Sequence, residues 1–306
     1  MFEGKVPDLT AQARKGLPGS FVQLAAGVTH YEIQGDPGGA TVVLIHGNAA
    51  PYVTWDQTIG ELCRAGFRVL RYDLFGHGFS DRPNLPTYDR QLYNAQLTEL
   101  LDRLGINGPV MVVGSSQGGS VGACFTARNP GRVEKLALLA PFFDELPGSH
   151  GLMYRLITTP PFGELMMRLM KDQKLADLSD AVVNPAIRPA LEPDVLQQFR
   201  FRGKRHAILA NLRGDALKDA TACYQGVKDQ GIPVLLTWGT ADQKLPGESM
   251  NRLRDLLPDI EYHELEGAGH LAHYEYPERM NPILVRFLAG DRSTVVEDRD
   301  PAQRTT

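Results

Sequence analysis

The sequence predicts one α/β domain built on a mainly parallel β-sheet, with a helical segment inserted late in the chain. Three observations support this prediction. Short β-branched runs alternate with longer amphipathic segments, as in successive βαβ units. The run Thr41–Ile45 is apolar throughout, as expected for a strand buried on both faces. A long stretch of helical patches then separates two groups of strands.

The elements before the insertion follow in a regular order. Strands are expected at Val28–Ile33, Thr41–Ile45, Phe67–Tyr72, Val110–Val113 and Lys135–Leu139. Helices are expected between them at Trp55–Ala65, Asp89–Leu104 and Gln117–Asn129. In the second helix the leucines recur near helical spacing, and Gly105 follows where a helix would end.

The alternation of strands and helices stops between Asp144 and Lys228, where no strand-like run occurs. Beyond it, further strands and helices are expected at Val234–Trp238, Glu248–Leu257, Ile260–Leu265 and Glu278–Leu288. We therefore expect an α/β core of residues 1–143 and 229–290 with a helical cap of residues 144–228. The polar residues 291–306 are expected to form a disordered tail.

Composition and charge narrow the class of function. The 306 residues are 42% hydrophobic and 22% charged, as in ordinary globular proteins, and the net charge of −4 argues against a nucleic-acid partner. No secretory signal or transmembrane segment is expected. The three cysteines, Cys63, Cys124 and Cys223, match no metal spacing and are expected to be buried thiols. Together these features predict a cytoplasmic protein without metal or other cofactor.

A nucleophilic serine is indicated where the strand Val110–Val113 runs into Gly114-Ser115-Ser116-Gln117-Gly118. A serine on such a strand-to-helix turn has a strained backbone, and the residues two positions away must be glycine-sized. The pattern recurs around Ser120, but that residue would lie inside the helix and is expected to pack against the sheet. Ser115 is expected to face away from the active edge.

With this motif in its context, the chain resembles the serine members of the α/β-hydrolase superfamily over residues 20–290. The segment Asp73-Leu74-Phe75-Gly76-His77-Gly78-Phe79-Ser80 is similar to the family's D-x-x-G-x-G-x-S sequence, in which Asp73 is expected to make loop hydrogen bonds. The resemblance implies the α/β-hydrolase fold, a mainly parallel central sheet flanked by helices. It also implies a helical cap inserted after the sixth strand.

The resemblance implies a catalytic triad of Ser116, Asp242 and His270. Asp242 follows a late strand in Gly-Thr-Ala-Asp, and His270 follows the last strand in Gly-Ala-Gly-His, which is the family's chain order. Asp242 would accept the Nδ1 hydrogen of His270, whose Nε2 would take the serine proton. Asp144 is the alternative acid, and His273 is expected to be a packing or capping residue.

The oxyanion hole is assigned by position to the backbone N–H groups of Asn48 and Gln117. Asn48 lies in His46-Gly47-Asn48 after the first buried strand, and His46 is expected to hold this loop. Haloalkane dehalogenases, which have the same fold, also carry Asn at this position. They place Asp where this chain has Ser116, so dehalogenation is disfavoured.

The predicted function is hydrolysis of small carboxylic esters with uncharged short-to-medium acyl groups, through an acyl-enzyme on Ser116. The motifs look most like those of bacterial carboxylesterases and monoacylglycerol-lipase-like enzymes. Carbon–carbon bond hydrolases, lactonases, thioesterases and perhydrolases using the same triad are the alternatives, and a non-catalytic ligand receptor is the alternative from another class. Labelling by a serine-directed probe distinguishes the last of these.

Two segments of the cap have open interpretations. The Met- and Leu-rich segment between Leu152 and Met170 is expected to line an acyl pocket, to form the cap's own core, or both. The basic residues Arg200, Arg202, Lys204 and Arg205 are expected on a solvated face of the cap, with an anionic substrate or membrane surface as the alternative.

Overall fold

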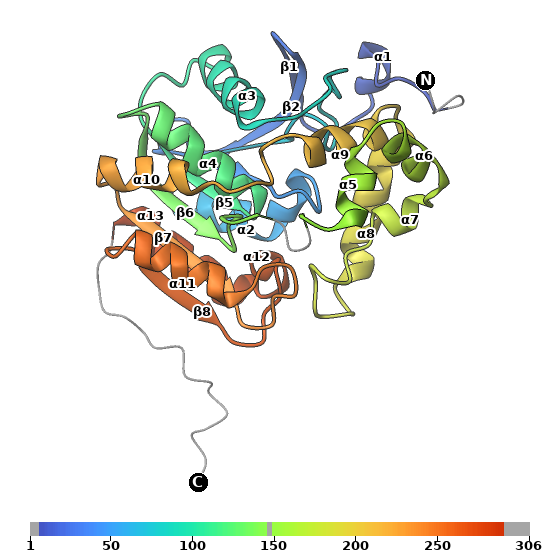
Figure 1. Ribbon diagram of the computed structural model, residues 1–306. Helices are drawn as coiled ribbons and strands as arrows, with labels where there is room; N and C mark the ends of the chain where they lie inside the picture. Colours follow the sequence, from blue (N-terminus) through green and yellow to red (C-terminus); the bar gives the residue numbers. More distant parts are fainter. Residues whose placement is uncertain (1–5, 146–148, 291–306) are drawn as a thin grey trace.

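The computed structural model describes residues 6–145 and 149–290 and confirms the α/β-hydrolase fold (Figure 1). Its sheet has eight strands in the order β1-β2-β4-β3-β5-β6-β7-β8. β2 runs antiparallel to β1 and β4, and the other neighbouring strands are parallel. The strands are β1 (Ser20–Leu24), β2 (Gly27–Gly35), β3 (Thr41–Ile45), β4 (Arg68–Tyr72), β5 (Val110–Ser115), β6 (Val133–Leu139), β7 (Val234–Gly239) and β8 (Glu261–Leu265). The predicted tail, residues 291–306, lies outside the described residues.

Helices cover both faces of the sheet, as its continuously apolar strands require. One face packs against α2 (Asp56–Arg64), α12 (Ala272–Glu275) and α13 (Pro277–Ala289). The other packs against α3 (Arg90–Arg103), α4 (Gln117–Arg128), α10 (Thr221–Gln230) and α11 (Gly247–Leu256). Two short helical segments, α1 (Ala11–Arg14) and η1 (Tyr52–Trp55), precede α2.

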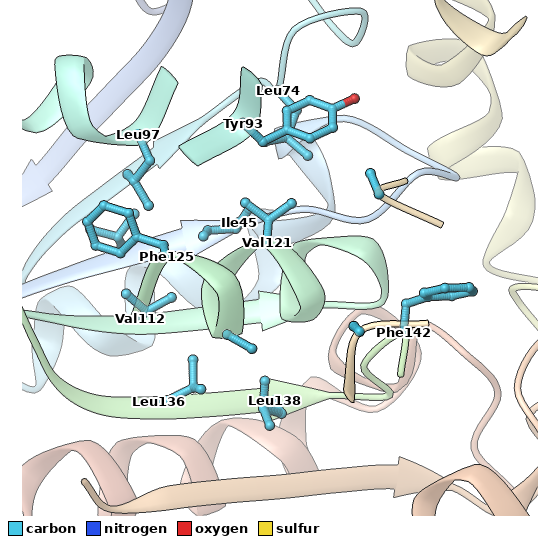
Figure 2. Close-up of a cluster of buried hydrophobic side chains, with 14 of the residues drawn as sticks. Ile45, Leu74, Tyr93, Leu97, Val112, Val121, Phe125, Leu136, Leu138 and Phe142 are labelled. Atoms are coloured by element: carbon cyan, nitrogen blue, oxygen red, sulfur yellow. The ribbon is translucent and has the colours of Figure 1, made fainter. Parts of the chain in front are cut away.

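Alternate residues of each strand enter the two halves of the core. Val43 and Ile45 face the α4 side, whereas Val42 and Leu44 face the α2 side. In Figure 2, Ile45 of β3 lies near Val121 and Phe125 of α4. The edge strand β1 was not predicted, because Ser20–Leu24 is mostly half-exposed and lacks a continuous apolar pattern.

The cap helices leave the sheet after β6, where the insertion was predicted. They are α5 (Leu152–Thr158), α6 (Phe162–Leu169), α7 (Asp172–Leu175), α8 (Arg188–Gln197), η2 (Gln198–Arg200) and α9 (Lys204–Arg213). Helices α5 to α8 gather at one end of the molecule (Figure 1). The predicted cap range also includes most of α10, but α10 packs beside α4 and contributes Tyr224 and Val227 to the core.

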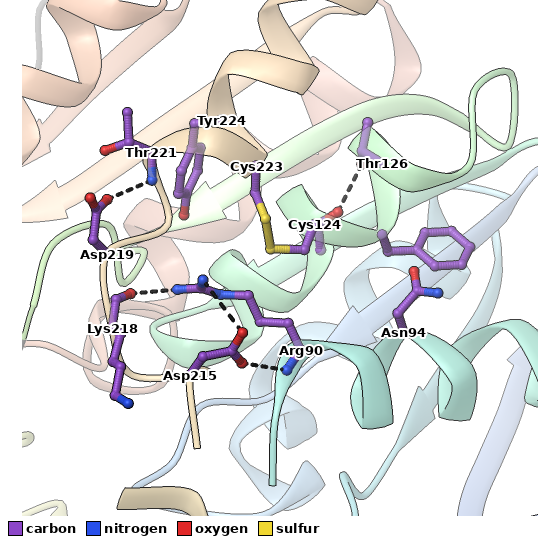
Figure 3. Close-up of a disulfide and its surroundings, with 12 residues drawn as sticks. Arg90, Asn94, Cys124, Thr126, Asp215, Lys218, Asp219, Thr221, Cys223 and Tyr224 are labelled. Carbon is purple, nitrogen blue, oxygen red and sulfur yellow. Dashed lines mark hydrogen bonds and ion pairs between the residues drawn. A yellow bond between two sulfur atoms is a disulfide. The ribbon is translucent and has the colours of Figure 1, made fainter. Parts of the chain in front are cut away.

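A disulfide joins Cys124 of α4 to Cys223 of α10 (Figure 3), so the prediction of buried thiols is wrong for these two residues. They are 99 positions apart in sequence, and the packing of α10 on α4 brings their Cα atoms within 4.6 Å. Cys63 is a free thiol, as predicted, but it is only half-buried. Because disulfides are rare in the cytosol, the cysteines no longer support a cytoplasmic location, which stays a prediction.

Among residues 6–145 and 149–290, no helix has the length and apolar character needed to cross a membrane.

Candidate active site

Ser116 lies on the turn between β5 and α4 with φ +53° and ψ −119°. A non-glycine residue rarely adopts positive φ, so this backbone is strained and must be held by its surroundings. The Ser116 N–H donates to the Leu139 carbonyl at 3.0 Å, and the Ser116 carbonyl accepts from the Phe142 N–H at 2.9 Å. The turn is therefore fixed to the end of the neighbouring strand β6.

Glycines around Ser116 are required by close backbone contacts. A Cβ on Gly114 would lie 2.3 Å from the Gly118 carbonyl oxygen, and a Cβ on Gly118 would lie 2.1 Å from that of Ile45. A Cβ on Gly47 would lie 2.9 Å from the Ser116 Cβ. The glycines thus let the nucleophile turn pack directly against the loop that follows β3.

The two neighbouring serines differ from Ser116 in exposure. Ser115 and Ser120 are both fully buried, and neither hydroxyl has a hydrogen-bond partner within the described residues. Ser120 lies inside α4, as predicted. Ser116 is half-buried, so its hydroxyl is the accessible one of the three.

His270 and Asp242, the predicted base and acid, are hydrogen-bonded to each other. The His270 Nδ1 lies 2.8 Å from the Asp242 Oδ2, and the two side chains are 4% and 0% exposed. The other carboxylate oxygen accepts from the N–H groups of Lys244 at 2.7 Å and Leu245 at 3.1 Å. With the Nδ1 hydrogen donated to Asp242, the imidazole Nε2 is left as a proton acceptor.

The three residues lie at one edge of the sheet. Ser116 follows β5, Asp242 follows β7 and His270 follows β8, and strands β5 to β8 are adjacent and parallel. A Cβ on Gly239 would lie 2.3 Å from the Ala268 carbonyl oxygen, so the acid and histidine loops are in contact. Parallel strands bring their carboxyl ends together, and this is where α/β proteins build their sites.

The alternative acid and base residues have other partners. Asp144 forms an ion pair with Arg252 of α11 at the surface. His273 is buried and stacks on Trp55 with ring centroids 4.4 Å apart, which agrees with a packing residue. Burial and the nearby His270 lower the pKa of His273 to about 3, so it stays neutral.

Asp73 holds loops together, as expected from its motif. Its buried carboxylate contacts His30 Nδ1 at 2.7 Å and accepts from the N–H groups of Tyr52 and Phe79, each at 2.9 Å. Burial alone would raise the pKa of Asp73, but these bonds and the charges of His30 and His46 lower it to about 2. His46 accepts from the Leu74 N–H at 3.0 Å through Nε2, which agrees with its predicted structural role.

The proposed oxyanion donors are linked by a residue that was not predicted. Asn211 of α9 donates to Asn48 Oδ1 at 3.0 Å and to Gln117 Oε1 at 2.9 Å. Its own Oδ1 accepts from Gln117 Nε2 at 3.0 Å and from the Tyr93 hydroxyl at 3.2 Å. Within the described residues, the backbone N–H groups of Asn48 and Gln117 donate no hydrogen bond. Asn211 belongs to no motif. The one sequence signal that could have identified it as a site residue is its polar side chain within an otherwise apolar stretch of α9.

The segment predicted to be the cap packs against this edge of the sheet. The Leu271 N–H donates to the Ala181 carbonyl at 3.0 Å, and a Cβ on Gly269 would lie 2.7 Å from Val183. A small apolar cluster joins cap residues such as Leu178 and Val182 to Ala50, near Asn48, and to Leu271, next to His270. Cap side chains therefore pack on both sides of the candidate site.

The structure gives the exposure of the Met- and Leu-rich segment and of the basic residues of the cap. Leu152, Met153, Phe162, Leu165 and Leu169 are exposed, so the prediction of a cap core is wrong for these five residues, whereas Met167 of the same segment is buried. The acyl-pocket lining stays a prediction. Lys204 is buried and donates to the Gly76 carbonyl at 3.1 Å, which contradicts its predicted solvated position. Arg200 and Arg202 are exposed, as expected.

Comparisons with known proteins identify the family of this chain. A protein-family profile described as "Alpha/beta hydrolase family" matches residues 42–283. The chain is 29% identical over 285 residues to a 2-hydroxy-6-oxononadienedioate/2-hydroxy-6-oxononatrienedioate hydrolase of Paraburkholderia phymatum, covering 88% of this chain and 94% of that protein.

Solved structures show the same fold. An enol-lactonase from Burkholderia xenovorans LB400 superposes with a TM-score of 0.75 at 23% identity, covering 88% of this chain and 100% of that one. A carboxylesterase from Bacillus subtilis has a TM-score of 0.71 at 20% identity, covering 91% and 95%. The chain therefore belongs to the alpha/beta hydrolase family.

Proposed function

We propose that this protein is a serine hydrolase that cleaves carboxylic esters through an acyl-enzyme on Ser116. The observation that carries the proposal is the His270–Asp242 hydrogen bond of 2.8 Å at the sheet edge where the strained Ser116 lies. A neutral imidazole oriented by a buried carboxylate is the general base that a serine nucleophile needs. The fold alone would not support this assignment, because many chemistries share it.

The proposed reaction has two halves. His270 Nε2 takes the Ser116 proton as Oγ attacks the ester carbonyl, and the N–H groups of Asn48 and Gln117 stabilise the oxyanion. The C–O bond then breaks, and His270 returns the proton to the departing alcohol. In the second half, water loses a proton to His270 as it attacks the acyl carbonyl. The bond to Ser116 Oγ then breaks, His270 returns the proton to Oγ, and the carboxylic acid leaves.

Uncharged short-to-medium acyl groups remain the proposed substrate class, but the support no longer comes from the segment between Leu152 and Met170. The helices α5 to α9 are assigned to the cap and α10 to the core, since α10 packs on α4. Support for an apolar substrate comes from the cluster of Ala50, Leu178, Val182 and Leu271 around the site. Apolar side chains packed next to the site favour uncharged acyl chains, because each buried methylene contributes about 0.8 kcal/mol.

Carbon–carbon bond hydrolysis is the second candidate, and the Paraburkholderia phymatum relative favours it by its name. Enol-lactone hydrolysis is suggested in the same way by a structural neighbour. A panel of p-nitrophenyl esters of increasing chain length, an enol-lactone and a 2-hydroxy-6-oxo-dienoate separates the three. The ester proposal expects the highest kcat/KM on an ester; a higher value on the dienoate would replace it.

Labelling by a fluorophosphonate probe tests the nucleophile. The wild-type protein is expected to be labelled and to turn over esters, Ser116→Ala to lose both, and Ser120→Ala to keep both. Ser120 is the matched control because it lies in the same glycine-rich segment, in the same pattern, yet is buried within α4. A folded wild-type protein that resists labelling would contradict the serine hydrolase assignment.

A further inference from the structure

We propose that the outer face of α5 and α6 docks this protein on an anionic lipid surface. Seven large apolar side chains are exposed in the described part of the chain, and six belong to these two helices. Their exposed fractions are 74% for Leu152, 60% for Met153, 37% for Leu156, 54% for Phe162, 53% for Leu165 and 74% for Leu169. Exposed apolar side chains gathered in this way mark an interaction surface.

The spacing of these residues gives each helix an apolar side toward solvent. Phe162, Leu165 and Leu169 recur at intervals of three and four, so they form one stripe along α6. The same helix turns Gly163 and Met167 inward, where both are buried. The usual arrangement, with the apolar stripe facing the protein, is therefore reversed in α6.

Polar contacts attach the inner side of the two helices to α9. The Tyr154 hydroxyl donates to the Leu212 carbonyl at 2.6 Å. Arg213 donates to the Thr158 carbonyl at 2.9 Å and to Glu164 Oε1 at 2.7 Å. These contacts hold α5 and α6 in place at the end of the molecule where the inserted helices gather in Figure 1, while their apolar side chains are exposed to solvent.

The charges around the outer face of α5 and α6 indicate which kind of surface binds there. Arg155, Arg168 and Lys171 are exposed and form no ion pair within residues 6–145 and 149–290. The nearby acids Glu164 and Asp172 are paired with Arg213 and Arg205 of α9. The face is therefore positive, although the whole chain carries a net charge of −4.

An anionic bilayer complements both features of this face. Leu and Phe side chains enter the boundary between headgroups and acyl chains, and Arg and Lys pair with anionic headgroups. A second copy of the chain fits less well, because a two-fold contact through this face would bring its cations against one another. Helices of this length lie on the surface rather than span the bilayer.

Sedimentation with lipid vesicles tests the docking face. The wild-type chain is expected to bind phosphatidylcholine vesicles containing 30% phosphatidylglycerol, and to bind pure phosphatidylcholine more weakly. Leu165→Gln with Leu169→Gln should lower the bound fraction at least tenfold. Arg155→Glu with Arg168→Glu should remove the preference for the anionic vesicles. Leu85→Gln is the matched control, since Leu85 is 38% exposed and lies outside these helices.

Three outcomes would overturn the docking proposal: no wild-type binding to either vesicle, equal binding by the leucine variant, or equal loss in Leu85→Gln. Analytical ultracentrifugation covers the self-association alternative, because a wild-type dimer that the leucine variant dissociates would make this face a contact between copies. The docking variants should hydrolyse a soluble ester at the wild-type rate, so this test is independent of the proposed reaction.

A different observation leads to a second inference, which rests on the proposed function. We infer that Asn211 is a positioning residue that ties the cap to both oxyanion donors. Asn211 is 1% exposed, and its amide hydrogen-bonds the side chains of Asn48, in the loop after β3, and Gln117, at the start of α4. The four bonds use both donors and both acceptor positions of the amide. Asn211 therefore sets the spacing of the two N–H groups.

Kinetics of Asn211 variants test this role. Asn211→Leu is expected to lower kcat and the rate of fluorophosphonate labelling about 10- to 100-fold, with KM nearly unchanged. A misplaced oxyanion donor reduces the stabilisation of the transition state without changing the binding of the substrate. Asn211→Asp keeps an oxygen at the Oδ1 position but loses both donated bonds, and should fall between Asn211→Leu and wild type. Gln198→Leu is the control, because Gln198 is a buried cap amide that accepts from the Gly78 N–H at 2.8 Å, and its own hydrogen bonds go to neither Asn48 nor Gln117.

Equal losses in Asn211→Leu and Gln198→Leu, or wild-type kcat in Asn211→Leu, would show that Asn211 only packs the cap. Thermal unfolding of each variant separates these results from misfolding. If the wild-type protein itself is not labelled, the proposed function fails instead, and the vesicle test is unaffected.

Discussion

The sheet edge and the cap hold their functional side chains in different ways. At the sheet edge, Ser116, Asp242 and His270 each follow a strand end, and the surrounding backbone leaves little freedom. In the cap, the position of Asn211 depends on how α9 rests on loops more than 90 residues away in the chain. The comparison teaches that backbone packing places the proposed nucleophile, acid and base, whereas long-range contacts of side chains place the cap.

The largest expected effect tests the sheet edge. Asp242→Asn should lower kcat by about three to four orders of magnitude on an ester at saturating concentration, because the amide favours the wrong tautomer of His270. Asp144→Asn is the control and should change kcat less than about tenfold, since Asp144 pairs with Arg252 instead. The reverse result, with both variants folded by circular dichroism, would move the acid to Asp144.

The disulfide tests how α10 is held to the core. Replacing Cys124 and Cys223 by Ala should lower the free energy of unfolding by about 2–5 kcal/mol, because the bond closes a long loop in the unfolded chain. Cys63→Ala is the control, since Cys63 is a free thiol. Urea unfolding without reductant measures both. An unchanged midpoint in the double variant would mean that the disulfide does not constrain the unfolded chain.

The smallest expected effect is a pH dependence at the contact between cap and core. Burial, with a further contribution from Arg82, lowers the pKa of Lys204 to about 7, although Asp73 acts in the opposite direction. His46 and His77 also face this lysine, and its charge lowers the pKa of each. An unfolded lysine titrates near 10.4, so between about pH 7 and pH 10 the unfolded chain binds one more proton. The free energy of unfolding should therefore rise with pH across this window.

Lys204→Met removes that proton difference. From pH 7 to pH 9.5, the wild-type free energy of unfolding should rise relative to the variant's by about 3 kcal/mol. Urea unfolding of both proteins at the two pH values gives the change. A wild-type–variant difference that stays constant with pH would mean that Lys204 titrates normally when buried against Gly76.

Much of the sheet edge was predictable because its signals are local. The glycines around Ser116 are needed by backbone contacts at the turn itself, so the motif and its geometry coincide. Apolar runs such as Thr41–Ile45 marked the buried strands, because a strand covered on both faces has no polar side. The loops that carry Asp242 and His270 follow such strands, so their common edge was implied by the parallel order.

Only the tertiary structure decided the features that depend on contacts between distant segments. The disulfide needs α10 to lie on α4, which no cysteine spacing indicates. The outward direction of Leu165 and Leu169 follows from the bonds of α9 to the inner side of α6, and an apolar stripe has the same pattern whichever way it faces. Asn211 contacts Asn48 and Gln117 because α9 packs against the core. Local sterics can be read from neighbouring residues, but burial and pairing require the whole chain to be folded.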